Sequence, residues 1–197
     1  MKIILASRSG VRKKILDKHK IENEVIVSNV DEHEAKKSLL SAGADPLSIS
    51  KNLAEIKSIK VSNKCPNRYV LGADSVISLN GALINKPNSR KEAFAILKKL
   101  NNSRHYLISS VCISKNGAMI WNYTDSSELK MKHLNDDELS VYLNKIDTKT
   151  LLAYGVYQIE ADGLELFEYV KGDKDSIMGL PIKEVINYIK KLKKKKK

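Results

Sequence analysis

The segment Tyr69-Val70-Leu71-Gly72-Ala73-Asp74-Ser75-Val76-Ile77-Ser78-Leu79 decides the fold, because it reads as a buried strand with a carboxylate in its middle. Apolar runs on both sides of Asp74 predict that this part of the chain lies inside the protein. The pair Asn80-Gly81 then predicts a hairpin turn into a short strand over 82–84, which leads to Lys86. Burying a carboxylate is costly without a partner, so Asp74 requires a lysine or a metal ion nearby.

The composition is that of a globular protein. A chain of 197 residues with 42% hydrophobic residues can bury a sizeable core in one large domain. No apolar run of about 18 residues occurs, so no membrane span is expected. The first six residues are too short an apolar stretch for a signal peptide, and we expect a cytoplasmic protein. Cys65 and Cys112 show no spacing typical of a metal site or a disulfide framework, so we expect both to be reduced.

The net charge of +12 is concentrated at the carboxyl end, where residues 190–197 contain seven lysines. We expect one α/β domain with two lobes over residues 1–190 and a solvated lysine-rich tail over 191–197. Such a tail can attract polyanions weakly and without specificity. It contains no aromatic residue that could stack on the bases of a single strand.

The pattern along the chain predicts strands that alternate with helices, with two hairpins between them. Because hairpins join antiparallel strands, the sheet should be mixed, in an α/β fold with flanking helices. Helices are expected over 11–19, from Asp45-Pro46, from Ser89 with Glu92, from Asn135 with Glu138, and from Pro181. The expected strands are 3–6, 24–30, 69–79, 82–84, 106–113, 118–121, 129–131, 156–159 and 164–170.

Four polar clusters are candidates for a site that binds a phosphate and a metal ion. They are Ser7, Ser9, Arg12 and Lys13 at a strand-to-helix junction, Asp31-Glu32 at the end of a strand, Asp74, and Lys86 after the hairpin. Hydroxyls, Arg and Lys suit phosphate oxygens, and carboxylates suit Mg²⁺ or Mn²⁺. Each cluster also has an ordinary structural explanation, such as helix capping by Ser7 and Ser9 or an exposed first helical turn for Arg12 and Lys13.

An ordered set of motifs resembles the Maf family of nucleoside triphosphate pyrophosphatases. The stretch from Ser7 to Lys13 is similar to its S-x-S-x-x-R signature, and Val30-Asp31-Glu32 to its V-D-E segment. Further matches, in order along the chain, are Leu53-Ala54 with Lys57, Gly72-Ala73-Asp74-Ser75, Lys86-Pro87, Tyr157-Gln158-Ile159-Glu160, Gly172-Asp173 and Gly179-Leu180-Pro181.

This resemblance implies a cytoplasmic hydrolase that splits a nucleoside triphosphate into the monophosphate and pyrophosphate. It also implies a strongly twisted mixed sheet with two lobes around a cleft, related to inosine triphosphatases, a homodimer and a divalent cation, Mg²⁺ or Mn²⁺. Asp74 would be the proton acceptor, and Glu32 with Asp74 would hold the metal. The residues implied by the family are Asp74, Glu32, Lys57 and Lys86 for catalysis and Ser7, Ser9, Arg12, Lys13 and Glu160 for substrate binding.

The preferred base stays open at this point. Glu160 resembles the branch that handles modified nucleotides such as 7-methyl-GTP, whereas Tyr157 resembles the branch that favours dTTP and UTP. Gly10-Val11 also replaces a Pro-Arg pair that is frequent in the family, which removes one positive charge. Two alternative functions are a non-catalytic regulator of cell division that binds nucleotides or nucleic acid, and a pyrophosphatase for deaminated purine triphosphates. The acidic positions Glu32 and Asp74 speak against the first, and the S-x-S-x-x-R start against the second.

Overall fold

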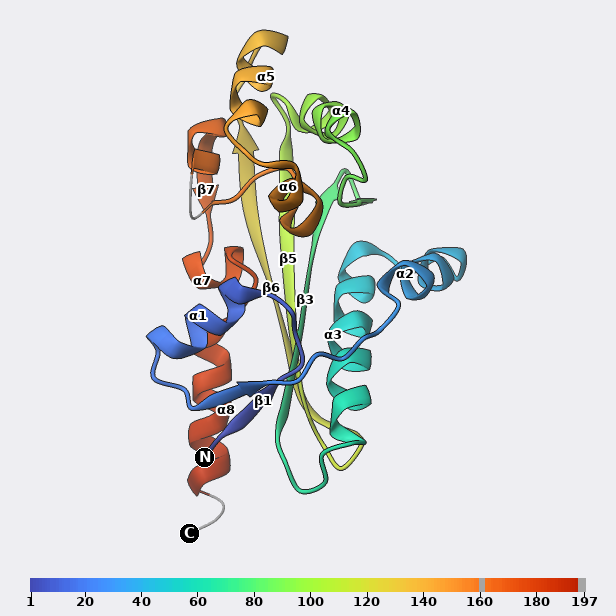
Figure 1. Ribbon diagram of the computed structural model, residues 1–197, viewed down its shortest axis with the longest axis vertical. Helices are drawn as coiled ribbons and strands as arrows, with labels where there is room; N and C mark the ends of the chain where they lie inside the picture. The colour runs from blue at the N-terminus through green and yellow to red at the C-terminus, as the bar shows by residue number, and fades with distance from the viewer. Residues whose placement is uncertain (160–161, 195–197) are drawn as a thin grey trace.

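The computed structural model describes residues 1–159 and 162–194 and contains one seven-stranded sheet (Figure 1). The strands follow the order β2-β1-β3-β5-β6-β7, and β4 pairs with β3 beside this path. Their bounds are β1 Ile3–Leu5, β2 Asn23–Val25, β3 Val70–Leu79, β4 Ala82–Ile84, β5 Arg104–Lys115, β6 Ala118–Met131 and β7 Phe167–Lys171. Strand β1 runs parallel to β2 and β3, and the remaining pairs are antiparallel, so the predicted mixed sheet is confirmed.

Helices gather at two ends of the long strands β3, β5 and β6, which gives the molecule two lobes (Figure 1). Helices α4, α5 and α6 lie at one end, and α1, α3 and α8 lie at the other. The helices are α1 Gly10–Lys18, α2 Glu32–Ser41, α3 Pro46–Ser62, α4 Arg90–Leu100, α5 Asp136–Asn144, α6 Thr148–Tyr154, α7 Lys174–Ile177 and α8 Ile182–Lys194, with a 3₁₀ turn over Asp162–Leu166. Among the described residues, no helix is long and apolar enough to cross a lipid bilayer.

Helix α3 packs closely on strand β3, because Gly72 leaves room for its backbone. A Cβ atom placed on Gly72 would lie 2.1 Å from the carbonyl oxygen of Ala54 and 2.8 Å from the nitrogen of Ser58. Both distances are shorter than any real van der Waals contact, so only glycine fits here. This contact brings Lys57 of α3 against the part of β3 where Asp74 lies.

Separate hydrophobic clusters fill the two lobes. In the lobe with the termini, Ile3, Leu5 and Leu71 pack with Val185 and Ile189 of α8. In the other lobe, Leu97 of α4, Leu139 of α5 and Leu151 of α6 pack against Leu129 of β6, as do other buried side chains. The long strands pass through both clusters, so burial of apolar surface in either lobe stabilises the same sheet.

Several predicted elements are wrong in extent. The strand expected over 24–30 ends at Val25, because Asn29 has a left-handed backbone (φ 48°) and Asp31 caps helix α2. Asp31-Glu32 therefore starts a helix that was not predicted, since α2 buries no side chain and shows little apolar periodicity. The strand expected over 156–159 is absent. Val156, Tyr157 and Ile159 are buried in irregular chain that follows Gly155 (φ 104°).

The helix and hairpin signals were more reliable. Both Asn-Gly turns join antiparallel strands, and the helices from Pro46, Arg90 and Asp136 begin where predicted. Helices α6 and α7 were not predicted, and the last strand begins at Phe167 rather than Leu164. Helix α8 continues to Lys194 and so runs past residue 190, where the solvated tail was expected to begin.

We expect Gly72→Ala to lower the free energy of unfolding by about 3 kcal/mol, because the added methyl group must push α3 away from β3. Urea denaturation followed by circular dichroism measures this change. Gly10→Ala is the matched control, because no atom lies within 4 Å of a Cβ atom at that position. Equal stability of Gly72→Ala and the wild type would contradict the close packing described here.

The buried ring of His105 should make the protein less stable in acid. Its Nε2 atom lies 3.0 Å from the hydroxyl of Tyr157, and burial lowers the pKa of His105 from 6.5 to about 4. Below pH 6.5, His105 of the unfolded chain therefore binds a proton that His105 of the folded chain does not bind. The free energy of unfolding falls as the pH drops from 6.5 to about 4. The total loss should be about 3 kcal/mol.

Unfolding free energies measured between pH 7 and pH 4 test this. His105→Gln should flatten the acid slope whatever its stability at pH 7, whereas His33→Gln, at an exposed position, should keep it. A wild-type slope in His105→Gln would show that another group causes the acid sensitivity.

Candidate functional site

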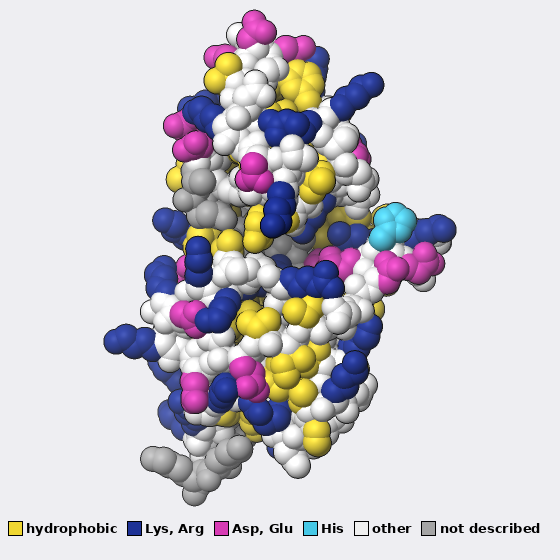
Figure 2. Space-filling model, viewed as in Figure 1, with side chains coloured by type: hydrophobic (Ala, Val, Ile, Leu, Met, Phe, Trp, Pro, Cys, Tyr) yellow, Lys and Arg dark blue, Asp and Glu magenta, His cyan; other side chains and the backbone are white. Residues whose placement is uncertain are grey.

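A cavity of about 650 Å³ lies between the two lobes. It is lined by the end of β1 and the start of α1, the segment 27–32, the middle of β3, the segment 84–86 and the chain over 153–159 and 177–179. In the space-filling view, acidic and basic side chains meet where α2 projects from the body of the molecule (Figure 2). Segments from across the sequence therefore contribute polar groups to one concave surface, which is typical of a ligand site.

Lys57 lies between two carboxylates in this cavity. Its Nζ atom is 2.7 Å from Oδ1 of Asp74 and 2.8 Å from Oε1 of Glu32. The side chains of Asp74 and Lys57 are 6% and 7% exposed, whereas that of Glu32 is 44% exposed. The lysine partner predicted for a buried Asp74 is therefore present. The second oxygen of Asp74, Oδ2, is buried, and no described residue donates a hydrogen bond to it.

The charges around Glu32 hold its pKa below the usual value. Partial burial alone would raise this pKa, but the charge and hydrogen bond of Lys57 outweigh that effect, and Lys36 and Lys86 add to it. Glu32 is therefore a carboxylate at neutral pH. It faces the more open side of the cavity, so it can contact both Lys57 and a bound ligand.

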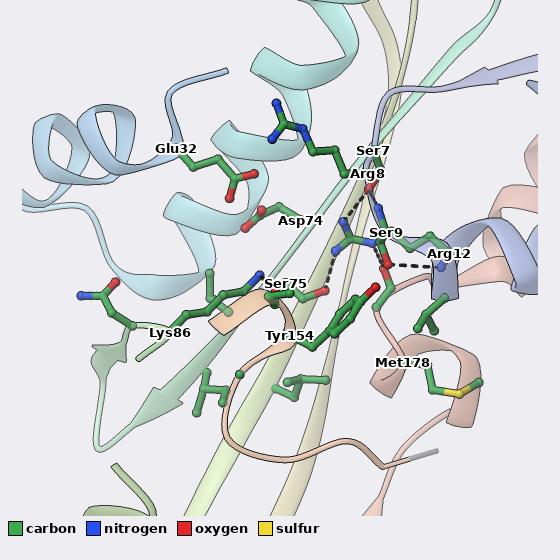
Figure 3. A pocket seen from close by; sticks show the side chains of 18 of the residues that line it. Ser7, Arg8, Ser9, Arg12, Glu32, Asp74, Ser75, Lys86, Tyr154 and Met178 are labelled. Carbon is green, nitrogen blue, oxygen red and sulfur yellow. Dashed lines mark hydrogen bonds between the residues drawn. The ribbon is translucent and has the colours of Figure 1, made fainter. Parts of the chain in front are cut away.

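Arg12 ties three segments of the chain together at the other side of the cavity (Figure 3). Its guanidinium donates to the carbonyl oxygens of Gly179 (2.8 Å) and Ala73 (3.0 Å) and to the hydroxyls of Ser7 and Ser75 (3.1 Å each). Four of its five N–H groups are thus used within the protein. Burial lowers the pKa of Arg12, and the nearby charges of Asp74 and Glu32 oppose that shift.

The two serines of the strand-to-helix junction have internal partners as well. The hydroxyl oxygen of Ser9 accepts the backbone N–H of Arg12 at 3.3 Å and caps α1. That of Ser7 accepts the backbone N–H of Ser9 at 3.2 Å, besides the side chain of Arg12. Both serines line the cavity, and their hydroxyl protons can turn toward a ligand.

Lys86 reaches into the cavity from the segment that follows strand β4. Its ammonium donates to the carbonyl oxygen of Ala153 at 2.7 Å, so it touches the opposite lobe. Desolvation lowers the pKa of Lys86, the charge of Glu32 opposes this, and the charge of Arg12 adds to it. Breaking the contact with Ala153 would free Lys86 for an anionic ligand.

One predicted site residue is placed elsewhere. Lys13 does not line the cavity and instead pairs with Asp17 at 2.5 Å on an exposed face of α1. Because Arg12 points inward, its neighbour lies about 100° further round the helix and points outward. Glu160, the other residue expected to bind substrate, lies outside the described residues.

Sequence reasoning missed several residues that line the cavity. Arg8 and Ser75 lie inside the family motifs. Each is a polar residue next to a predicted site residue, Arg8 beside Ser7 and Ser75 beside Asp74, and that position was the available signal. Lys36 lies on the helix that was not predicted, and Tyr154 and Met178 lie on segments that carried no chemical signal. Arg8 and Lys36 add positive charge near the carboxylates. Tyr154 and Met178 form an apolar wall on the far side, as Figure 3 shows.

Comparison with known proteins agrees with this arrangement. The Maf-like protein family model matches residues 2–192 of the chain. The chain belongs to the Maf family. A nucleoside triphosphate pyrophosphatase of Pelagibacter ubique is 56% identical over 191 residues, which cover 97% of this chain and 98% of that protein.

More distant relatives carry two different names. A nucleoside triphosphate pyrophosphatase of Ruegeria pomeroyi is 36% identical over 95% of this chain and 94% of its own length. A 7-methyl-GTP pyrophosphatase of Brucella abortus is 32% identical over 92% of both chains. Among solved structures, a HAM1 protein from Coxiella burnetii has a TM-score of 0.46 and 14% identity, over 66% of this chain and 73% of that chain.

The carboxylates of this Maf-family site fit a metal ion that arrives with a phosphate ligand. Within residues 1–159 and 162–194, no group of three or more His, Cys, Asp or Glu side chains is placed to hold a metal. Mg²⁺, however, is usually held by one or two carboxylates together with substrate phosphates. Glu32 and the unpartnered Oδ2 of Asp74 supply oxygen donors of this kind.

Replacing Lys57 should destabilise this Maf-family chain strongly. Lys57→Met leaves the buried carboxylate of Asp74 without its cation, and removal of one partner from a buried pair costs about 3–5 kcal/mol. The double variant Lys57→Met with Asp74→Asn removes both charges and should regain about half of that loss or more. Thermal and urea unfolding of the four proteins in this double-mutant cycle measure the coupling. Additive effects of the two substitutions would refute it.

Proposed function

We propose that the chain hydrolyses a nucleoside triphosphate to the monophosphate and pyrophosphate, with Asp74 as the proton acceptor. One observation carries the role of Asp74: a buried carboxylate has one oxygen on the Lys57 ammonium and the other unpartnered, in a cavity lined by cations. The names of the Maf-family relatives support the class of reaction, the hydrolysis of an acid anhydride.

The proposed reaction is an in-line displacement at the α-phosphorus. A water oxygen forms a bond to this phosphorus, and the bond from the phosphorus to the bridging oxygen of the β-phosphate breaks. Oδ2 of Asp74 orients the water and takes its proton, while Lys57 holds Oδ1 and fixes the carboxylate. Pyrophosphate leaves with the electron pair of the broken bond.

The cations of the cavity would stabilise the charge of the reacting and leaving groups. Lys86 and Lys36 both lie close enough to lower the pKa of Glu32 through their charges. Phosphoryl-type transfer depends mainly on positioning and on such electrostatic stabilisation. Lys86 would exchange the carbonyl of Ala153 for a phosphate oxygen when substrate binds.

We also propose that Mg²⁺ or Mn²⁺ assists, held by Glu32, Asp74 and the phosphates of the substrate. Such an ion, when bound, supplies positive charge to phosphate oxygens and favours loss of a proton from water. The carboxylates of Glu32 and Asp74 form an all-oxygen donor set, which supports this choice of ion.

The apolar wall of the cavity would receive the base and sugar. Tyr154, Val156 and Met178 line this wall. Figure 3 shows Tyr154 and Met178 well apart from Glu32. A nucleotide panel with dTTP, UTP and 7-methyl-GTP identifies the preferred base, and the name of the Brucella relative justifies the last member of this panel.

The non-catalytic alternative relies on the lysines near the carboxyl end. Those that the structure describes lie on the last turns of α8, and no residue of α8 between Ile182 and Lys194 lines the cavity. Binding of nucleic acid through these lysines would therefore leave Lys57, Asp74 and the other polar groups of the cavity without a role.

We expect Asp74→Asn to reduce kcat for the best nucleotide at least a hundredfold, because the amide cannot accept the proton of water. Pyrophosphate release with Mg²⁺ or Mn²⁺ present measures this effect. Asp45→Asn is the matched control, since asparagine can still cap α3 away from the cavity. Full activity of Asp74→Asn would exclude Asp74 as the proton acceptor.

A further inference from the structure

Arg8 occupies an unusual place in the cavity. It lies between Ser7 and Ser9 at the junction of β1 and α1, it is exposed, and it lines the cavity (Figure 3). Its Nη2 atom donates to the side-chain oxygen of Asn29 at 2.5 Å. A long, exposed cation is thus held in one direction by a neutral amide, which orients the guanidinium without neutralising it.

Asn29 is itself fixed by the backbone and by helix α3. Its backbone is left-handed (φ 48°), a conformation that asparagine tolerates better than most residues. Its carbonyl oxygen accepts a hydrogen bond from Lys60 of α3 at 2.6 Å. The amide that holds Arg8 therefore belongs to a loop anchored on the same helix that carries Lys57.

The other cations of the cavity differ from Arg8 in what they already contact. Arg12 uses four of its five N–H groups inside the protein, and Lys57 lies between two carboxylates. Arg8 forms one hydrogen bond, and no carboxylate pairs with it among residues 1–159 and 162–194. Its charge and most of its donors remain available to an anion that enters the cavity.

We propose that Arg8, oriented by Asn29, is a substrate-binding residue that grips the phosphates destined to leave as pyrophosphate. This inference rests on the proposed function and adds the residue that recognises the leaving group. In Figure 3, Arg8 lies well apart from Tyr154 and Met178, which form the apolar wall for the base. A guanidinium with free N–H groups can bind two phosphate oxygens at once.

Direct binding tests this assignment without turnover. Isothermal titration calorimetry with inorganic pyrophosphate and Mg²⁺ should show a Kd about tenfold higher for Arg8→Gln than for the wild type. Lys13→Gln is the matched control, because it removes the same charge five residues away, outside the cavity. It should bind pyrophosphate like the wild type.

A nucleoside monophosphate provides the second arm of the experiment. Its Kd should change less than about twofold in Arg8→Gln, because the proposed contact is with the phosphates that the monophosphate lacks. Wild-type affinity of Arg8→Gln for pyrophosphate would overturn the proposal. So would equal weakening of pyrophosphate and monophosphate, or a wild-type protein that binds no pyrophosphate.

The role of Asn29 has its own variant. Asn29→Gly keeps the left-handed backbone but removes the amide that orients Arg8, so pyrophosphate binding should weaken about threefold. Unchanged binding would remove Asn29 from the proposal. If the wild type binds pyrophosphate but hydrolyses no nucleotide of the panel, the proposed function fails, and the comparison of Arg8→Gln with Lys13→Gln still decides where pyrophosphate is bound.

Discussion

The ion pair between Lys57 and Asp74 is the interaction on which the rest of the structure depends. Both side chains are almost fully buried, and their Nζ and Oδ1 atoms are 2.7 Å apart. Neither charge is tolerable there alone. The pair exists because α3 lies directly against β3, and that close approach requires a glycine at position 72. A single missing side chain thus allows a charged pair to form in the middle of the sheet.

The cations around this pair differ in the partners that they contact. Lys57 and Arg12 are used for internal contacts that fix the carboxylates and the surrounding backbone. Within the described residues, Lys86 is held by a carbonyl and Arg8 by an amide, and such neutral partners cost little to exchange or to extend. In the proposed reaction, the residues of one charged cluster would serve two functions, and their hydrogen-bond partners distinguish them better than their residue types do.

Much of this arrangement could be predicted from the sequence, and the exceptions have physical reasons. A carboxylate between apolar runs implied a buried partner, and the motif order placed Lys57, Lys86 and Glu32 with Asp74. Lys13 was expected in the site but lies outside the cavity, because a motif gives spacing along the chain but not which side of a helix turns inward. The helix beginning at Glu32 was missed because it has no fully buried side chain, and the pair Ala35 and Leu39 is too short an apolar pattern to mark it. Val156, Tyr157 and Ile159 are apolar and buried, but burial in irregular chain gives the same pattern as a strand.

The contact between Arg12 and the carbonyl of Gly179 spans 167 positions of the chain. Contacts of such sequence separation form late, since a long loop must close before they do. During synthesis, α1 and the first strands leave the ribosome long before Gly179 does. The cavity is incomplete until then. A chain cut short before α7 would lack both this contact and α8, whose Val185 and Ile189 complete the core around β1 and β3.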